Sequence, residues 1–295
     1  MRIVFIGCVK SSYLLLKTLL EAGKNIVGVV TKEHSEVNAD FVDLTDLCRS
    51  YDIDYFYARN INDDEVISFL KDKDPDIIYC FGWSQIIKKP ILELPSKGVV
   101  GFHPAELPHN RGRHPIIWAL VMGLERTAST FFMMDEGADT GDIISQRIIE
   151  IKKEDYAEDL YDKIMNAACN QVIDFTEEIE SESCILKKQE AEIGNTWRKR
   201  TKSDGKIDWR MGSYAIYNLV RGLSRPYVGA HLVYQGCDYK VWRVEEIITE
   251  DYRNIEPGKV IQKISDKEII VKAYDNLIHI LECDEIGVKE GEYLE

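Results

Sequence analysis

The sequence predicts an α/β fold in which a Rossmann-like, doubly wound and mostly parallel sheet is followed by a smaller C-terminal β-barrel of the OB type. In the first half of the chain, short β-branched runs alternate with helical patterns, which is typical of βαβ units. Beyond residue 206, one helical pattern precedes five short strand-like segments separated by turns, which indicates a small barrel. The length of 295 residues also fits about two domains.

Local signals define the elements of the first half. Leucines at helical spacing begin after Ser11 and end at Gly23, a residue that suits the position just after a helix. Pro115 can open a helix, because the first helical position needs no N–H. Apolar residues repeat every 3.6 residues over 158–181, which predicts one long amphipathic helix. We expect strands at 2–7, 25–31, 76–81, 98–102 and 127–134, and further helices near 40–51 and 63–73.

A change of composition marks the predicted domain boundary. Residues 191–206 are mostly polar, and their second half holds five cations against one carboxylate, Asp204. We therefore predict a Rossmann-like domain over 1–190, a basic linker over 191–206 and a C-terminal domain over 207–295. The last should contain a helix at 213–223 and strands at 231–234, 239–247, 258–264, 268–271 and 277–281.

The composition argues against several classes of partner. There are 51 acidic against 37 basic residues, and the net charge of −14 repels nucleic-acid phosphates and anionic membranes. Apolar runs are far shorter than the roughly 18 residues that span a bilayer, and the first residues lack a signal-peptide pattern. The seven scattered cysteines form no C-x-x-C pair, which favours reduced thiols. We expect a soluble cytoplasmic protein.

Three loops are candidates for chemistry, because open α/β sheets bind ligands beyond the carboxyl ends of their strands. They are 81–85, 103–115 and 135–142. Pro104 favours an extended backbone at His103, which would hold the imidazole at a strand end. A carboxylate from the acidic turn 135–142, either Asp139 or Asp142, would make that imidazole a stronger base.

Each of these features also has a purely structural interpretation. His103 can be a hydrogen-bonded polar residue at a strand end, and the acidic turn can be an Asx turn in which Gly137 and Gly141 supply positive φ angles. The aromatic residues at 79, 81 and 83 fit core packing better than a stacking platform. Arg111 and Arg113 fit recognition of a carboxylate or phosphate, or a solvated loop.

Several cofactor motifs are missing from the sequence. Residues 7–12 do not form G-x-G-x-x-G, and no P-loop occurs, so neither a dinucleotide nor a P-loop phosphate site is predicted. A calcium loop starting at Asp135 would put Gly137 and Gln146 at ligand positions. The histidines at 103, 109 and 114 lack zinc-protease spacing. We expect chemistry without a metal.

Two motifs together resemble those of the formyltransferases that use 10-formyltetrahydrofolate. One is H-x-x-x-L-P-x-x-R-G, which starts at His103, and the other is D-x-G-x-D-T-G-D over 135–142. In the C-terminal part, I-D-W at 207–209, I-Y-N-L-V-R-G-L at 216–223 and P-Y at 226–227 resemble the start of the family's barrel. The tail is more similar to members that formylate nucleotide-linked amino sugars than to members that formylate initiator methionyl-tRNA.

The resemblance implies a direct transfer of the formyl group to a primary amine. His103 would be the general base and Asp139, the first aspartate of D-T-G-D, its partner. Folate would lie against loop residues and backbone groups, and the nucleotide diphosphate of the acceptor would meet Lys10, Arg198 and Arg200. The implied folate-binding residues are Gln85, Ile86, Ile87, Arg113, Asp135, Glu136, Gly137, Ala138 and Asp139.

One position departs from the family. The family has Asn-x-His, whose asparagine stabilises the oxyanion, whereas this chain has Gly101 before Phe102 and His103. Loss of such a donor costs on the order of 10²- to 10³-fold in rate. Asn110, His109 or a backbone N–H of the same loop can replace it, and Asn110 is our candidate.

Three other functions remain open. A methionyl-tRNA formyltransferase would share the chemistry but must hold a polyanion, which the net charge disfavours. A formyltetrahydrofolate hydrolase would be expected to begin with a regulatory module, whereas this chain opens directly with its first strand. Gly101 also allows a catalytically weak folate-binding homologue. Whether the barrel pairs two subunits into a homodimer is likewise open.

Overall fold

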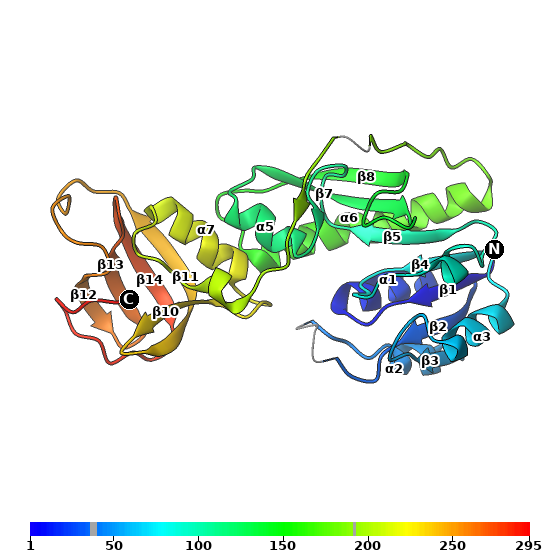
Figure 1. Cartoon of the computed structure of the whole chain (residues 1–295), viewed down its shortest axis with the longest axis horizontal. Helices are drawn as coiled ribbons and strands as arrows, with labels where there is room; N and C mark the ends of the chain where they lie inside the picture. Colours follow the sequence, from blue (N-terminus) through cyan, green and yellow to red (C-terminus); the bar gives the residue numbers. More distant parts are fainter. Residues whose placement is uncertain (36–39, 191–192) are drawn as a thin grey trace. The chain divides into compact units, whose positions relative to one another are not determined.

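The computed structural model describes residues 1–35, 40–190 and 193–295 (Figure 1). The first two residues of the predicted linker lie outside this range. The chain forms two compact units that interleave along the sequence, so the domain bounds 1–190 and 207–295 stay a prediction. The first unit comprises Met1–Pro115, Thr127–Ile149 and Asp162–Trp197, and the second comprises Ile116–Arg126, Glu150–Tyr161 and Arg198–Glu295.

The first unit is built on a seven-stranded sheet with the order β3-β2-β1-β4-β5-β7-β8. Strands β1 to β5 are parallel, and β7 runs antiparallel to β5. This arrangement confirms the predicted Rossmann-like, mostly parallel sheet, and its order reverses at β1. The strands are β1 (Ile3–Ile6), β2 (Ile26–Thr31), β3 (Tyr55–Tyr57), β4 (Ile77–Cys80), β5 (Val99–His103), β7 (Arg126–Met133) and β8 (Ile143–Glu150).

The helices match the predicted periodicities, with differences at their ends. The long amphipathic helix is confirmed as α6, whereas the helix expected near 40–51 is reduced to α2. Strands β3 and β8 and the short α4 have no counterpart among the predicted elements. The helices are α1 (Lys10–Glu21), α2 (Thr45–Ser50), α3 (Asp64–Lys73), α4 (Lys89–Leu92), α5 (Pro115–Val121) and α6 (Ala157–Glu180).

An aromatic cluster holds the sheet beneath the strand ends. The ring of Phe81 lies 5.5 Å from that of Phe5, 5.3 Å from Tyr79 and 5.2 Å from Phe131. From helix α6, Phe175 adds a ring 4.8 Å from Phe131. Tyr79 and Phe81 are both fully buried, which confirms their predicted place in the core. The loops that follow these strands therefore start from a rigid support.

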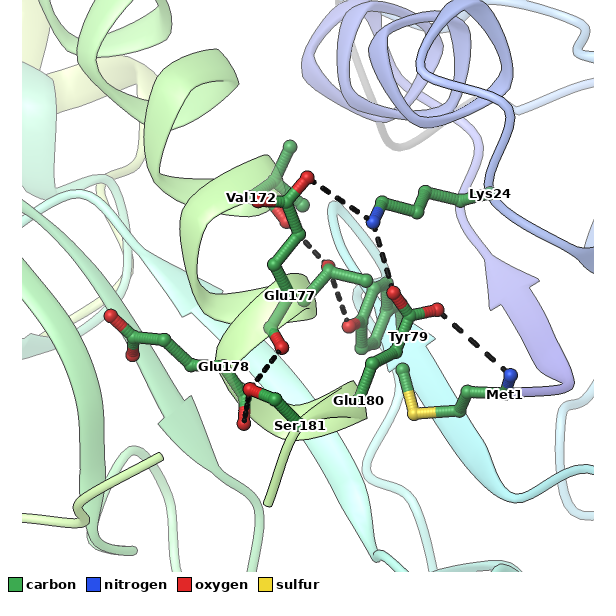
Figure 2. Close-up of polar contacts among 9 residues, drawn as sticks. Met1, Lys24, Tyr79, Val172, Glu177, Glu178, Glu180 and Ser181 are labelled. Carbon is green, nitrogen blue, oxygen red and sulfur yellow. Dashed lines mark hydrogen bonds and ion pairs between the residues drawn. The ribbon is translucent and has the colours of Figure 1, made fainter. Parts of the chain in front are cut away.

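The end of α6 is fastened to the sheet and to the start of the chain (Figure 2). The buried hydroxyl of Tyr79 on β4 lies 2.8 Å from the Thr176 hydroxyl, so the two side chains share a hydrogen bond. Around it, Lys24 Nζ lies 3.0 Å from Glu180 and 3.5 Å from Glu177, and the chain's α-amino group lies 3.9 Å from Glu180. Partly exposed ion pairs of this kind stabilise weakly, so the buried packing and hydrogen bond dominate.

The second unit carries the predicted helix and all five predicted strands. The strands form an antiparallel sheet with the order β10-β11-β14-β13-β12, and α7 packs its apolar face against them. Among the described residues no helix combines the length and apolarity needed to cross a bilayer. The elements are α7 (Ser213–Leu223), β10 (Ala230–Tyr234), β11 (Cys237–Ile247), β12 (Val260–Ser265), β13 (Glu268–Lys272) and β14 (Leu277–Cys283).

A buried histidine in this sheet makes stability depend on pH. His231 on β10 is only 4% exposed, and burial lowers its pKa below the usual 6.5, against a counteracting effect of Asp238. Lysines 202, 206 and 240 act in the same direction as burial. Because the folded-state pKa is depressed, the unfolded chain binds the extra proton first as pH falls below about 6.5. We expect the free energy of unfolding to decrease between pH 7 and pH 5.

Urea unfolding at several pH values, followed by circular dichroism, measures this dependence. His231→Gln should flatten the curve in that window, whereas His34→Gln serves as a control outside this sheet. An unchanged pH dependence in His231→Gln would show that other groups cause it.

Candidate functional site

Two of the three predicted loops meet around His103, the last residue of β5. The acidic turn 135–142 reaches it by a route that the sequence did not predict. We expected the turn to leave from an edge shared by parallel strands, but β7 is antiparallel to β5, and Met133 pairs with Val100. The turn therefore starts beside the beginning of β5 and folds back, with Met133 N–H donating to the Asp142 carbonyl at 2.8 Å.

His103 is 5% exposed, and one of its ring nitrogens is hydrogen-bonded while the other faces a carboxylate. Nε2 lies 2.7 Å from the carbonyl oxygen of Asn110. Because a carbonyl can only accept, Nε2 carries the hydrogen and donates it. Nδ1 faces Asp139 Oδ2 at 3.7 Å. The imidazole thus has one nitrogen fixed by the loop and one turned toward a carboxylate, which is the arrangement that a general base requires.

Asp139, one of the two predicted carboxylates, is the one that contacts His103. Its Oδ2 also accepts the backbone N–H of Gly112 at 2.9 Å. Its backbone has φ +58°, a left-handed conformation that is uncommon for a residue with a side chain. Asp142 instead contributes its backbone carbonyl to the base of the turn.

The acidic turn contains the predicted Asx turn, although its glycines act differently from the prediction. Asp135 Oδ1 accepts the Gly137 N–H at 2.9 Å and the Thr140 hydroxyl at 2.7 Å. Neither Gly137 nor Gly141 has a positive φ, so that part of the prediction is wrong. A Cβ on Gly141 would lie 1.7 Å from the Met133 carbonyl oxygen, and one on Gly137 would lie 2.0 Å from Thr140 Oγ1. These positions need glycine because other atoms approach them closely.

Gly101 is opposite Phe132 in the β5–β7 register. A Cβ there would lie 2.7 Å from Phe132 Cζ and 3.0 Å from Met134 Cγ. The space into which a side chain at this position would grow is therefore lined by apolar atoms. Position 101 therefore offers the site no side-chain hydrogen-bond donor.

Asn110, our candidate for the oxyanion donor, is fixed by its backbone beside the imidazole. Its carbonyl accepts from His103, its N–H donates to Asn195 Oδ1 at 3.0 Å, and its φ is +63°. Within the described chain, its side-chain amide has no hydrogen-bond partner. His109, the alternative, is exposed.

The predicted folate-binding residues differ in their exposure and in whether their side chains already have hydrogen-bond partners within the protein. Gln85 is occupied by the segment that follows β3: Oε1 accepts the Ile61 N–H and Nε2 donates to the Arg59 carbonyl, both at 2.9 Å. Ile87 is buried in the core, whereas Ile86 is 77% exposed. Arg113 donates to the Ser84 carbonyl at 3.3 Å and so joins two of the loops. The residues 135–138 are exposed.

The predicted acceptor-binding cations are partly engaged in the protein. Lys10 opens α1 in the first unit. In the second unit, both guanidinium nitrogens of Arg198 bind Asp204, at 2.8 and 2.5 Å, and this pairing holds the pKa of that carboxyl well below its usual range. Arg200 is 8% exposed, and its guanidinium lies 4.5 Å from the centre of the Trp118 ring. Arg198 and Arg200 thus stabilise the segment that we predicted as a linker.

Two residues at the site, Gln189 and Asn195, were not predicted from the sequence, and Arg111 was predicted only as a ligand-binding or solvated cation. Arg111 is 8% exposed and donates to the Asp139 carbonyl at 3.2 Å and to Gln189 at 3.0 Å. No local motif signals such contacts, because Arg111 and Gln189 are 78 positions apart. In the described part of the chain, no group of His, Cys, Asp and Glu side chains could hold a metal ion.

Two family models match the chain: "Formyl transferase" over residues 1–176 and "Formyl transferase, C-terminal domain" over residues 199–291. The methionyl-tRNA formyltransferase of Caldanaerobacter subterraneus subsp. tengcongensis is 32% identical over 295 residues, which are 98% of this chain and 94% of that protein.

Two solved structures share the fold. WlaRD, a sugar 3N-formyl transferase crystallised in the presence of dTDP and 5-N-formyl-THF, has a TM-score of 0.68 at 18% identity and covers 95% of this chain and 97% of its own. The N-formyltransferase from Helicobacter canadensis, in complex with folinic acid and dTDP-3-aminofucose, has a TM-score of 0.67 at 16% identity, with coverage of 95% and 98%.

Proposed function

The chain belongs to the formyl transferase family, and we propose that it moves the formyl group of 10-formyltetrahydrofolate to the primary amine of a nucleotide-linked amino sugar. The observation that carries the proposed chemistry is the pair of His103 and Asp139, whose Nδ1 and Oδ2 lie 3.7 Å apart. A base and its carboxylate partner at this separation can take up a proton together.

In the proposed reaction, a bond forms between the acceptor nitrogen and the formyl carbon, and the bond from that carbon to N10 of the folate breaks. Nδ1 of His103 takes the proton that the amine loses, because Nε2 is already committed to the Asn110 carbonyl. The imidazolium then returns this proton to N10, which leaves as the secondary amine of tetrahydrofolate. Asp139 stabilises the positive imidazolium. The side-chain amide of Asn110 donates to the negative charge that develops on the formyl oxygen.

The folate supplies the formyl group and would lie against the exposed Ile86 and the exposed turn 135–138. Backbone N–H and C=O groups there can form hydrogen bonds with a pterin ring, since such groups fix a ligand's orientation in many small-molecule sites. Gln85 and Arg113 would shape this surface through the loop contacts described above.

The charge of the chain favours a nucleotide-linked sugar over a tRNA as the acceptor. A tRNA is held by many contacts from cationic side chains to phosphates. The net charge here is −14, and basic and acidic residues nearly balance over 198–295, the part that follows the first unit. A nucleotide diphosphate needs only a few cations, and two proteins of the same fold were crystallised with dTDP or a dTDP-linked amino sugar.

Methionyl-tRNA is the second candidate acceptor, because relatives that cover nearly the whole chain are methionyl-tRNA formyltransferases. Incubation with 10-formyltetrahydrofolate and a panel of UDP-, GDP- and dTDP-linked 3-amino and 4-amino sugars, read by mass spectrometry, tests the proposal. A formyl addition to one sugar supports it. Formylation of charged initiator tRNA with every sugar unmodified overturns the acceptor assignment.

Two further measurements with 10-formyltetrahydrofolate test the other two candidate functions, a hydrolase and a catalytically weak folate-binding homologue. Formate release without any amine would indicate a hydrolase. Retention of folate binding with no transfer to any acceptor would indicate a catalytically weak homologue, in line with the glycine at position 101.

We expect Lys10 to bind the diphosphate of the acceptor. Lys10→Ala should raise the KM for the nucleotide sugar by about 10-fold or more, since a hydrogen bond to a charged group is worth roughly 1.5–3 kcal/mol. The kcat should stay within about twofold, because this contact is the same before and during the reaction. Lys17→Ala on the same helix is the matched control.

Arg198→Gln gives the corresponding test for the basic segment. The variant should raise the same KM only if the diphosphate displaces Asp204 from the guanidinium. An unchanged KM in both Lys10→Ala and Arg198→Gln would place the diphosphate elsewhere.

A further inference from the structure

The carboxylate that contacts His103 belongs to Asp139, whose backbone has an unfavourable conformation that other residues must stabilise. Asp139 has φ +58°, a strained conformation for a non-glycine residue, which persists only where the surroundings hold it in place. Its side chain is exposed by 22%, so solvent competes for the carboxylate. The position of Oδ2 relative to His103 therefore depends on what fixes the main chain of Asp139.

Two side chains from distant parts of the sequence provide this support. The Asp139 carbonyl accepts from Gln189 Nε2 at 3.0 Å and from Arg111 Nε at 3.2 Å. Gln189 Nε2 also donates to the Gly141 carbonyl at 2.7 Å, and its Oε1 accepts from Arg111 Nη2 at 3.0 Å. Gln189 thus uses both its donor and its acceptor ends, and it closes a ring of hydrogen bonds around the turn.

The segments on either side of Gln189 bind both loops of the site. We call residues 187–190 and 193–197 the strap. Its first part pairs with the start of β8, where Lys187 and Ile143 exchange two backbone hydrogen bonds of 2.8 Å. Its second part contains β9 (Thr196–Trp197), which runs parallel to β6 (Arg111–Gly112) in the His103 loop.

The second part of the strap also binds Asn110, whose carbonyl contacts the imidazole, and its neighbour Arg111. Asn195 accepts the Arg111 N–H through its carbonyl at 3.1 Å and the Asn110 N–H through Oδ1 at 3.0 Å. Asn110 in turn accepts the hydrogen of His103 Nε2. The strap therefore fixes the imidazole through Asn195 and the carboxylate through Gln189.

We propose that Gln189 is a positioning residue for the formyl transfer, which, together with Arg111, holds the backbone of Asp139 so that its carboxylate stays between His103 Nδ1 and the Gly112 N–H. This inference rests on the proposed function for its catalytic consequence. The hydrogen-bond ring itself does not depend on the identity of the acceptor.

The inference predicts a change in rate with little change in binding. Gln189→Met keeps the length of the side chain but removes all three hydrogen bonds. The kcat should fall by about 10- to 100-fold, because a displacement of about 1 Å in a catalytic group costs on that order. The KM for 10-formyltetrahydrofolate should change less than kcat, because Gln189 binds the carbonyls of Asp139 and Gly141 and not the exposed residues 135–138 against which folate would lie.

A double-mutant cycle separates positioning from general damage. If Gln189 acts through Asp139, Gln189→Met should have little further effect on kcat in the Asp139→Asn background. Gln171→Met is the matched control, because Gln171 is a fully buried glutamine whose Nε2 binds the Ser129 carbonyl and the Ser145 hydroxyl. It should lower stability but leave kcat within about threefold. Additive losses in the cycle, or an unchanged kcat in Gln189→Met, would overturn the inference.

A readout without any acceptor keeps this test apart from that of the proposed function. Hydrogen–deuterium exchange of a peptide covering 135–142 should become at least several-fold faster in Gln189→Met and stay unchanged in Gln171→Met. Unchanged exchange in Gln189→Met would overturn the positioning role. Faster exchange in a protein that formylates no acceptor would support the hold on Asp139 and count against the proposed function.

Discussion

His103→Asn should lower kcat for formyl transfer by about 10²- to 10⁴-fold, the contribution typical of a general base. The asparagine side chain is short and cannot accept a proton at neutral pH, so the attacking amine must lose its proton to water. The KM for 10-formyltetrahydrofolate should stay near the wild-type value, because the imidazole is engaged by Asn110 and Asp139 within the protein. Initial rates with the acceptor identified by the sugar panel measure this effect.

The matched control lies in the same loop. His109 is exposed and makes no side-chain hydrogen bond in the described part of the chain, so His109→Asn should retain most of the activity. If His103→Asn kept more than about a tenth of the wild-type kcat, the imidazole would not be the base. If His109→Asn lost activity to the same degree, His109 would contribute to catalysis as the alternative oxyanion donor, and the effect would not be specific to His103.

Gly141→Ala should have the second large effect, on both rate and stability. Its Cβ would lie 1.7 Å from the Met133 carbonyl oxygen and 2.9 Å from the carbonyl carbon, both of which belong to the backbone and cannot rotate away. The turn must shift, and Asp139 must shift with it. We expect kcat to fall by about 10²-fold or more, and the free energy of unfolding to fall by about 1–3 kcal/mol, as for overpacked sites.

A glycine in open space provides the control for this substitution. Apart from Gly287 and its two chain neighbours, no atom of the described residues lies within 4 Å of a Cβ built on Gly287, and its φ is not positive, so Gly287→Ala should change neither quantity. Enzyme rates and urea unfolding of the two variants give the comparison. Wild-type kcat in Gly141→Ala would mean that the turn does not need its present geometry to hold Asp139 in place.

Elements with a clear period were predictable because their signal is local. The parallel core strands read as continuous β-branched runs, since both faces are buried, and α6 follows the 3.6-residue repeat over its whole length. Strand β3 was missed because it has only three residues. Strand β8 was missed because exposed residues interrupt its second half.

The candidate site, like the fold, has features that were predictable from the sequence and features that were not. The position of His103 at a strand end and the aspartates of the acidic turn were enough to indicate a candidate base and two candidate acidic partners, Asp139 and Asp142, and the family resemblance pointed to Asp139. The sequence also showed directly that position 101 is a glycine and that dinucleotide and P-loop motifs are absent, because each of these features involves only a few neighbouring residues.

The sequence by itself determined most of the strands and helices in their order, the first and last residues of these elements to within a few positions, and the loops that hold the candidate site. Only the tertiary structure decided that Asp139 and not Asp142 contacts His103, that Phe132 lies against Gly101, and that Gln189 and Arg111 hold the acidic turn. The physical reason is the sequence distance over which each effect acts. Backbone propensity acts over a few neighbouring residues. The contacts named above depend on strand direction, register and loop conformation, which are fixed only when the whole chain packs.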